Sequence, residues 1–293
     1  MGLISLLFLA FLPPPPALAQ SGVWDRPWQN LTQLMAILQT VPEGRAVLEK
    51  AQRKDPRFAD RVKFGAASFT ESTFSRTYSL LDGKERIELR HDVTINKQLR
   101  LADAVVDLAH ELVHYTEKGM LDPYRPGFEL SQFVRNGIEG EGGELAAMKV
   151  ECRLAWSLER KYKNFPPHRL CERYRGQGNA FQQEEARLDY YAVGSWLGQL
   201  SKSLRKAIPE IHGDGSIFTS SYASKPYPVA LEEEYAMTRK AACANNRRKY
   251  RLIAAQSESD RKPAEASPKS LWEEQRRLKT YDRLYCRSIP GKN

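Results

Sequence analysis

The segment His110-Glu111-Leu112-Val113-His114 places two imidazoles and one carboxylate close together in the chain. Residues four apart lie on the same face of an α-helix, so His110 and His114 can direct two nitrogens at one metal ion. Glu111 is turned by about 100° from His110, which puts its carboxylate beside a metal-bound water and not on the metal. The segment therefore predicts a zinc site with His110 and His114 as ligands and Glu111 as general base.

A zinc ion held by three protein groups keeps a fourth position for water and lowers the pKa of that water towards about 7. A glutamate beside it takes the proton and passes it to a leaving amine. The chain has five histidines, so chance is a poor explanation for two of them at this spacing around a glutamate. The alternative, a buried helix with two ordinary histidines, is disfavoured because the motif falls on an amphipathic stretch.

That stretch is expected to form a helix over residues 101–118, after a small antiparallel sheet. Between about residues 58 and 96, aromatic, Ser and Thr residues, an Asp82-Gly83 turn and a period-two pattern over residues 86–90 indicate strands. The last strand should end near residues 93–96. The helix has an apolar stripe and a suitable stop at Gly119; the stripe is formed by Leu101, Val105, Leu108, Ala109, Leu112 and Val113.

The third zinc ligand is expected to be an acid. A metzincin would need glycine and histidine at fixed offsets after the motif, and Glu117 and Met120 occupy those positions, which excludes that class. Asp122 follows closely, but it lies just past the helix stop, beside a proline, and would need a very tight turn to reach back. The remaining candidates lie after the next loop, and they are Glu139, Glu141, Glu144 and Glu151.

Glu144 is the predicted third ligand because it begins the next expected helix, residues 144–162. Gly142 and Gly143 precede it and permit close backbone approach, and the small Ala147 lets two helices pack closely near the metal. Glu151 is seven residues further along the same face, and we expect it to support a ligand histidine from behind. The alternative for either glutamate is a solvated charge on a helix.

The four cysteines are even in number, which in an exported chain favours two disulfides with three conceivable connectivities. Proximity in sequence suggests Cys152 with Cys171 and Cys243 with Cys286. No two cysteines form a C-x-x-C pair, so a zinc site built from thiolates is not expected.

The first nineteen residues read as a removable signal peptide. Residues 3–12 are apolar, residues 13–16 are prolines, and Ala17-Leu18-Ala19 precedes Gln20 as a cleavage signature. The apolar run is too short for the roughly 20 residues of a membrane span, and no later segment is apolar enough for one. We expect a secreted or periplasmic protein.

The formal net charge of +9 and the pI of about 9.3 come largely from the C-terminal third of the chain. The basic residues there are interleaved with acids on helical stretches and show no nucleic-acid-binding motif, which favours a solvated face and no specific nucleic-acid partner. The partners that such a surface would attract are anionic polymers of the cell envelope or lipid headgroups. The main basic segments are Arg239-Lys240, Arg247-Arg248-Lys249, Arg261-Lys262 and Arg276-Arg277.

The motif, the strand before it and the glutamate on the following helix together resemble the gluzincin branch of zinc metallopeptidases. Gly142-Gly143-Glu144-x-x-Ala147, running into Glu151-Cys152, is similar to secreted bacterial zincin-like proteins. The resemblance covers roughly residues 87–152. It implies a zincin fold, zinc held by His110, His114 and Glu144, and Glu111 as base. The Asn-Glu-x-x-x-Asp pattern of thermolysin-like gluzincins is absent, so their specificity is not implied.

The resemblance also implies a strand that holds extended substrate, for which residues 86–93 are well placed, and a Tyr or His that stabilises the oxyanion. By type, the oxyanion candidates are Tyr115, Tyr190, Tyr191, His212 and Tyr222. The other two histidines, His91 and His168, are expected to be surface or structural residues.

The expected architecture is an α+β fold that is mostly helical, with a zincin-like small antiparallel sheet packed on the motif helix. Residues 20–165 would form the catalytic domain, and residues 166–293 a helical region that belongs either to the same domain or to another. Further helices are expected at about residues 31–38, 46–50, 183–206, 231–255 and 271–285.

The function expected from these features is zinc-dependent peptide-bond hydrolysis outside the cytoplasm, on protein or wall-peptide substrates. The alternative is a non-catalytic zincin-fold protein that binds the envelope. Glu111 discriminates between them, because a zinc protein without hydrolytic duty needs no base at that position.

Overall fold

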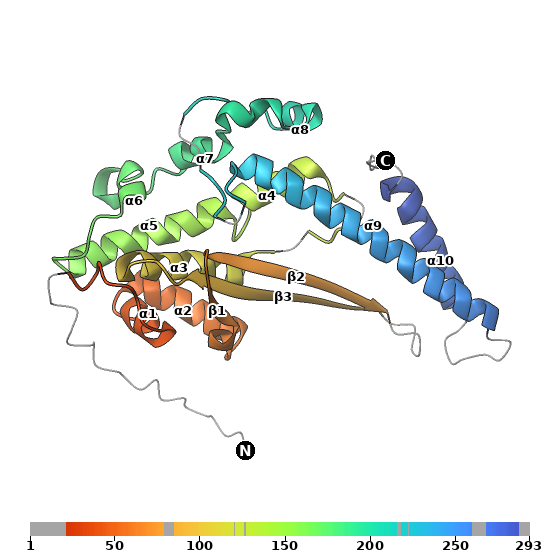
Figure 1. Ribbon diagram of the computed structural model, residues 1–293, viewed down its shortest axis with the longest axis horizontal. Helices are drawn as coiled ribbons and strands as arrows, with labels where there is room; N and C mark the ends of the chain where they lie inside the picture. The colour runs from red at the N-terminus through yellow and green to blue at the C-terminus, as the bar shows by residue number, and fades with distance from the viewer. Residues whose placement is uncertain are drawn as a thin grey trace, which may run out of the picture. The chain divides into compact units, whose positions relative to one another are not determined.

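The computed structural model describes residues 22–78, 85–119, 121–125, 127–215, 218–221, 223–259 and 268–286 (Figure 1). The fold is α+β, about 60% helical, with one small sheet. The signal peptide expected at residues 1–19, the Asp82-Gly83 turn and Tyr222 lie outside the described residues. Within the described part, no helix is both long and apolar enough to cross a bilayer.

The chain begins with two short helices, α1 (Leu31–Leu38) and α2 (Pro42–Lys54). The Asn30 side chain caps α1 by accepting a hydrogen bond from the amide of Gln33. The α2 helix starts earlier than expected, because proline at the first helical position loses no hydrogen bond. Gly44 is required in its first turn, since a Cβ there would lie 2.1 Å from the carbonyl oxygen of Leu38.

The sheet has three strands, β1 (Val62–Gly65), β2 (Phe69–Tyr78) and β3 (Glu85–Asn96), in the order β1-β3-β2. The expected antiparallel sheet is wrong in one respect: β1 pairs parallel with β3, so the sheet is mixed. Alternation of polar and apolar residues fixes which face of a strand is buried, and it does not encode the direction of the neighbouring strand.

The motif helix is α3 (Leu101–Glu117), which begins and ends within one residue of the expected bounds. Twelve of its seventeen residues are buried, so it lies in the core and carries its polar groups inside with it. Both α1 and α2 pack against it. The helix expected at residues 144–162 is α5 (Glu144–Lys161).

A further helix, α4 (Leu130–Glu139), lies in the stretch that the sequence indicated as loop. Its only apolar stripe is Leu130, Val134 and Ile138 at spacings of four, and glycine, proline and aromatic residues surround it. Such a short stripe among turn residues gives a weak helical pattern.

The rest of the chain is helical. The single helix expected at residues 183–206 is three pieces, because Gly194 adopts a φ of +54°; these are α7 (Gln183–Tyr191), a 3₁₀ turn (Gly194–Gly198) and α8 (Lys202–Ala207). The other elements are α6 (Arg169–Arg173), α9 (Tyr227–Ser259), α10 (Pro268–Tyr281) and a π-helical turn (Asp282–Cys286).

Two disulfides join neighbouring elements, and both are the pairs that sequence proximity suggested. Cys152–Cys171 ties α5 to α6, with Cα atoms 5.0 Å apart. Cys243–Cys286 ties α9 to the turn after α10, with Cα atoms 5.7 Å apart.

The chain forms two compact units. Unit 1 contains the described residues of Met1–Thr70, Asp92–Glu117 and Ala146–Gln183, and unit 2 those of Glu71–His91, Lys118–Leu145 and Glu184–Asn293. The division crosses the first turn of α5. Glu144 and Leu145 therefore belong to unit 2, and the rest of α5, from Ala146 onward, belongs to unit 1.

Candidate metal centre

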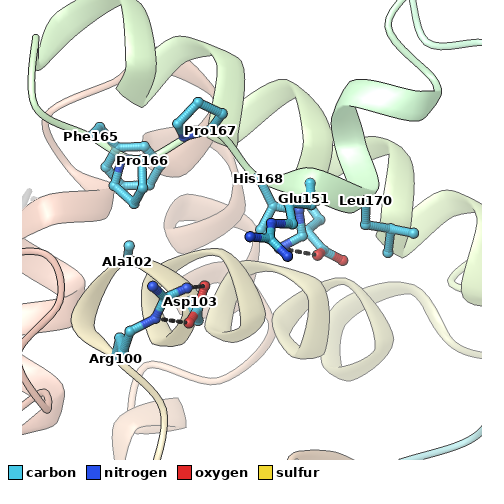
Figure 2. Close-up of a pocket in the computed structure, with 10 residues that line it drawn as sticks. Arg100, Ala102, Asp103, Glu151, Phe165, Pro166, Pro167, His168 and Leu170 are labelled. Atoms are coloured by element: carbon cyan, nitrogen blue, oxygen red, sulfur yellow. Dashed lines mark hydrogen bonds and ion pairs between the residues drawn. The ribbon is translucent and has the colours of Figure 1, made fainter.

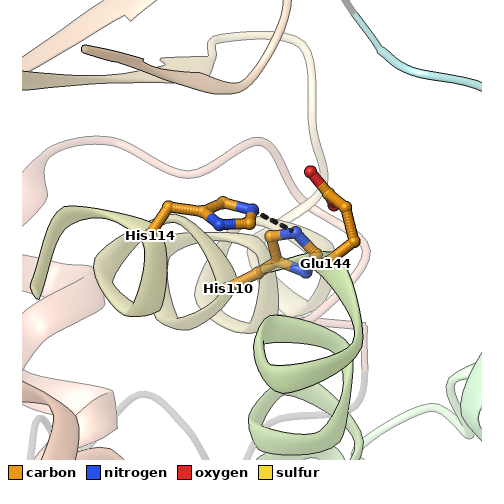
Figure 3. Close-up of side chains that lie close together, drawn as sticks. All are labelled: His110, His114 and Glu144. Carbon is orange, nitrogen blue, oxygen red and sulfur yellow. Dashed lines mark hydrogen bonds between the residues drawn. The ribbon is translucent and has the colours of Figure 1, made fainter. Parts of the chain in front are cut away.

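The two motif histidines bring their Nε2 atoms close together. Nε2 of His110 lies 3.1 Å from Nε2 of His114 (Figure 3). Two imidazole nitrogens on one tetrahedral zinc, each about 2.05 Å from it, are about 3.3 Å apart. The spacing of His110 and His114 is thus close to the one that a shared metal ion requires, as the helical spacing predicted.

Glu144 approaches these nitrogens from the first turn of α5. Ligand atoms of His110, His114 and Glu144 all lie within 4.8 Å of one another (Figure 3). The turn before it depends on glycine: Gly142 has a φ of +64°, and a Cβ on Gly143 would lie 2.9 Å from carbonyl oxygens of α4. The structure therefore brings together the three residues that the sequence singled out as ligands.

The other acidic candidates for the third ligand have different surroundings. Asp122 lies 3.5 Å from the guanidinium of Arg76 and accepts a hydrogen bond from the Tyr124 amide at 2.9 Å. Glu139 accepts a hydrogen bond from the hydroxyl of Tyr191. Glu141 is exposed. None of the three is in the cluster that contains the motif histidines.

Glu151 is hydrogen-bonded to His110 on the ring nitrogen that does not face His114, as expected. Its Oε2 lies 2.7 Å from Nδ1 of His110, and the carboxylate is buried, with 9% of the residue exposed. Because a carboxylate accepts, Nδ1 donates, and the lone pair of the neutral ring is then on Nε2. Nε2 is the nitrogen that faces His114, so this hydrogen bond prepares His110 to bind a metal ion.

The Glu111 carboxylate is hydrogen-bonded to β2 and is not part of the cluster of His110, His114 and Glu144. The Thr70 hydroxyl donates a hydrogen bond to Oε2 of Glu111 at 2.7 Å and also lies 3.0 Å from its backbone carbonyl. Residues 86–93 were expected to hold substrate beside the site. They lie in β3, where the pairing with β1 begins at Val93, and the strand whose side chain contacts Glu111 is β2. Thr70 was not predicted, because nothing in the residues around it signals a contact with Glu111.

Asp107 lies one helical turn before Glu111 on the same face of α3 and was also missed. Ser68 donates a hydrogen bond to its carboxyl group, while Oδ2 is buried with no hydrogen-bond partner among the described residues. Burial raises the pKa of Asp107 to about 7, and the negative charge of Glu111 adds to this effect. Its spacing of four from Glu111 is a signal that could have identified it.

The oxyanion candidates are spread over the structure. The Tyr190 hydroxyl lies 3.5 Å from the backbone carbonyl of Glu144, so Tyr190 is the candidate that reaches a member of the cluster. Tyr191 bonds to Glu139 instead, His212 has Nε2 3.2 Å from the carbonyl of Leu188, and Tyr115 is buried under the ammonium of Lys54.

Comparisons of the chain with family models, with curated proteins and with solved structures gave no match. The resemblance to gluzincins accordingly stays a prediction, and the function has to be argued from the residues themselves.

Asp107 predicts a pH-dependent stability of the metal-free protein. The folded pKa of about 7 lies above the ordinary value of 3.8, so the folded chain keeps a proton that the unfolded chain has lost. The contribution of Asp107 to the unfolding free energy therefore falls as the pH rises from about 4 to about 7. The unfolding free energy of Asp107→Asn, relative to that of wild type, should therefore rise by on the order of 2 kcal/mol from pH 5 to pH 8.

The measurement is urea unfolding in the presence of a chelator at both pH values. Asp103→Asn is the matched control, since Asp103 is one turn earlier on α3 and pairs with Arg100 at 2.8 Å. Its effect should be equal at the two pH values. A pH-independent difference for Asp107→Asn would contradict the assignment of a raised pKa.

Proposed function

We propose that the protein is a secreted zinc-dependent metallopeptidase that hydrolyses peptide bonds. The observation that carries the proposal is the convergence of His110, His114 and Glu144 within 4.8 Å, with Glu111 held aside by Thr70. Two neutral nitrogens and one carboxylate form the ligand set of several catalytic zinc sites, in which the fourth position belongs to water.

The chain's own residues fit such an ion. The Nε2 atoms of His110 and His114 are spaced for tetrahedral binding, and Glu151 sets the tautomer of His110. When bound, zinc would act as a Lewis acid and lower the pKa of the water that attacks the substrate.

Glu111 is the proposed general base. It takes the proton of the attacking water and delivers it to the leaving amine. The hydrogen bond from Thr70 fixes the position of the Glu111 carboxylate. In the metal-free chain, burial raises the pKa of Asp107 to about 7, so this carboxyl is partly protonated at neutral pH and the negative charge packed behind Glu111 is limited.

Peptide substrates are favoured because β2 is an edge strand of the sheet and carries Thr70, the residue that contacts the proposed base Glu111. An extended peptide adds to a strand edge through main-chain hydrogen bonds. Export is supported by the two disulfides, which persist in oxidising compartments outside the cytoplasm.

The second candidate function is a non-catalytic zinc protein that binds the cell envelope. Glu111 argues against it, since a structural zinc site closes its coordination shell with ligands and needs no base. The two functions differ in one measurable respect, hydrolysis that depends on Glu111.

The test compares bound zinc and hydrolysis of a labelled unfolded protein for wild type and three variants. Glu111→Gln should keep zinc and lower the rate of hydrolysis by about 10²- to 10⁴-fold, because only the proton transfer is lost. Glu144→Gln should weaken zinc binding. Glu141→Gln removes an exposed carboxylate outside the cluster and should change neither quantity.

Two results would overturn the proposal. Zinc bound by wild type and by Glu111→Gln, with no hydrolysis of varied unfolded proteins or wall peptides by either, would leave the non-catalytic function. Wild-type protein that binds no zinc would exclude both.

A further inference from the structure

Glu151 has a second neighbour on the side away from His110. Its Oε1 lies 3.6 Å from Nε2 of His168, a residue that immediately precedes α6 (Figure 2). Glu151 thus lies between two imidazoles, one on each carboxylate oxygen. The sequence had indicated His168 as a surface or structural residue, and its contact with Glu151 links it to the candidate metal centre.

The Cys152–Cys171 disulfide fixes this arrangement. Nδ1 of His168 lies 3.2 Å from Sγ of Cys171. A carboxylate is a much stronger acceptor than a disulfide sulfur, so the proton of a neutral ring belongs on Nε2, toward Glu151. Cys152 follows Glu151 directly on α5, and both sulfurs are buried. The crosslink therefore holds the start of α6, and with it His168, against the turn of α5 that carries Glu151.

A cavity of about 810 Å³ lies next to this contact, lined by Glu151, His168 and the apolar Phe165, Pro166 and Pro167 (Figure 2). A cavity of this size with charged groups in its wall admits water. If His168 were removed, water there would compete for the carboxylate of Glu151 and loosen its hold on His110.

We propose that His168, fixed by the Cys152–Cys171 disulfide, is a positioning residue for the zinc site. It keeps Glu151 on Nδ1 of His110, and so keeps Nε2 of His110 directed at the metal position. This inference rests on the proposed function for the identity of the metal.

The measured quantity is the dissociation constant for zinc, determined by competition with a chromophoric chelator. Loss of the carboxylate that accepts from a ligand histidine weakens metal binding by about 10- to 100-fold. His168→Leu loosens that carboxylate without removing it, so it should weaken zinc binding by about tenfold, the lower end of this range. His168→Gln, whose amide nitrogen can take the place of Nε2, should stay within about threefold.

The disulfide is tested with a matched pair of double variants in the full chain. Cys152→Ala with Cys171→Ala should weaken zinc binding about as much as His168→Leu does. Cys243→Ala with Cys286→Ala removes the other disulfide and should leave zinc affinity unchanged. Equal affinities for wild type and His168→Leu, or equal losses in the leucine and glutamine variants, would overturn the role of His168.

A second readout needs no metal. In the metal-free protein, long-range ¹H–¹⁵N spectra report which ring nitrogen of His110 carries the proton. Wild type and His168→Gln should show the proton on Nδ1, and His168→Leu a mixture of both tautomers. The same spectrum in all three would overturn the inference. If wild type bound no zinc, the proposed function would fail by itself, and these spectra would still decide the role of His168.

The groove between α9 and α10, in unit 2, is strongly basic. A cavity of about 920 Å³ lies there, and the charged residues lining it are Arg247, Arg251, Arg276, Lys279, Arg283 and Asp282. Arg247 pairs with Asp282 at 2.7 Å. Among the described residues, the other four cations have no carboxylate partner. The groove therefore keeps an excess of positive charge.

The two helices hold this groove in a fixed shape. The Cys243–Cys286 disulfide ties α9 to the π-helical turn after α10, and the buried Asn246 side chain donates a hydrogen bond to the carbonyl of Leu278 on α10 at 2.9 Å. On α10 and that turn the lining residues run from Trp272 to Arg283, a rise of roughly 16 Å at 1.5 Å per residue. One small anion would engage one or two of these cations, whereas a linear polyanion engages the whole row.

The charge of the groove favours a phosphate chain as its occupant. Of the exposed apolar residues nearby, Leu252 and Leu284 are not among the lining residues, whereas Trp272 is. The Arg276 guanidinium lies 5.6 Å from the Trp272 ring centre, and Lys279 lies similarly over Tyr250, so each ring has a cation on one face. Arginine side chains match phosphate oxygens in geometry.

From this independent observation we infer that the α9–α10 groove binds a linear, phosphate-bearing polymer through its charges. The test is binding of inorganic polyphosphate to the full chain at increasing salt. Arg251→Gln with Arg283→Gln should lower the slope of log affinity against log salt by about 1.4, or about 0.7 for each lost contact. Lys202→Gln with Lys206→Gln, at the exposed positions of α8, removes the same charge and should leave the slope unchanged.

Three results would overturn the inference about the groove: equal losses in the two double variants, binding of single-stranded DNA as tight as or tighter than polyphosphate of equal charge, or binding to vesicles of anionic lipid without binding to polyphosphate. Polyphosphate binding that is tighter than that of single-stranded DNA and is weakened by the arginine substitutions would support it.

Discussion

Burial of α3 is the constraint on which the rest of the structure depends. One face of this helix packs apolar residues into the core, and the same burial takes Glu111, His114 and the Oδ2 atom of Asp107 out of water. A buried polar group is destabilising unless it finds a hydrogen-bond partner. The neighbouring elements supply such partners: β2 gives Thr70 to Glu111, and α5 gives Glu151 to His110.

Short-range spacing predicted much of this arrangement. A separation of four residues is enough to place His110 and His114 together, and a glycine pair before a helix start identified Glu144. Asp107 obeys the same helical spacing and was available to the same reasoning. The bounds of α3 and α5 followed from apolar periodicity, which is strong in long helices and weak in the single stripe of α4.

The contacts that could not be predicted join residues far apart in sequence. Thr70 and Glu111 are 41 residues apart, and nothing in the residues around a threonine specifies a distant partner. The parallel pairing of β1 with β3 escaped for a related reason, since a strand's pattern records burial and not its neighbour. His168 shows a third case, because its place beside Glu151 is set by the fold of the residues between Cys152 and Cys171.

The order of the cysteines along the chain has a consequence for assembly. The disulfides are sequential and not interleaved, with separations of 19 and 43 residues. Loop closure is easier for shorter loops, so under oxidising conditions each pair can form within its own stretch of chain. Cys152 and Cys171 both precede the two C-terminal cysteines. The disulfide beside Glu151 can thus form before the C-terminal helices fold, without any disulfide having to be reshuffled.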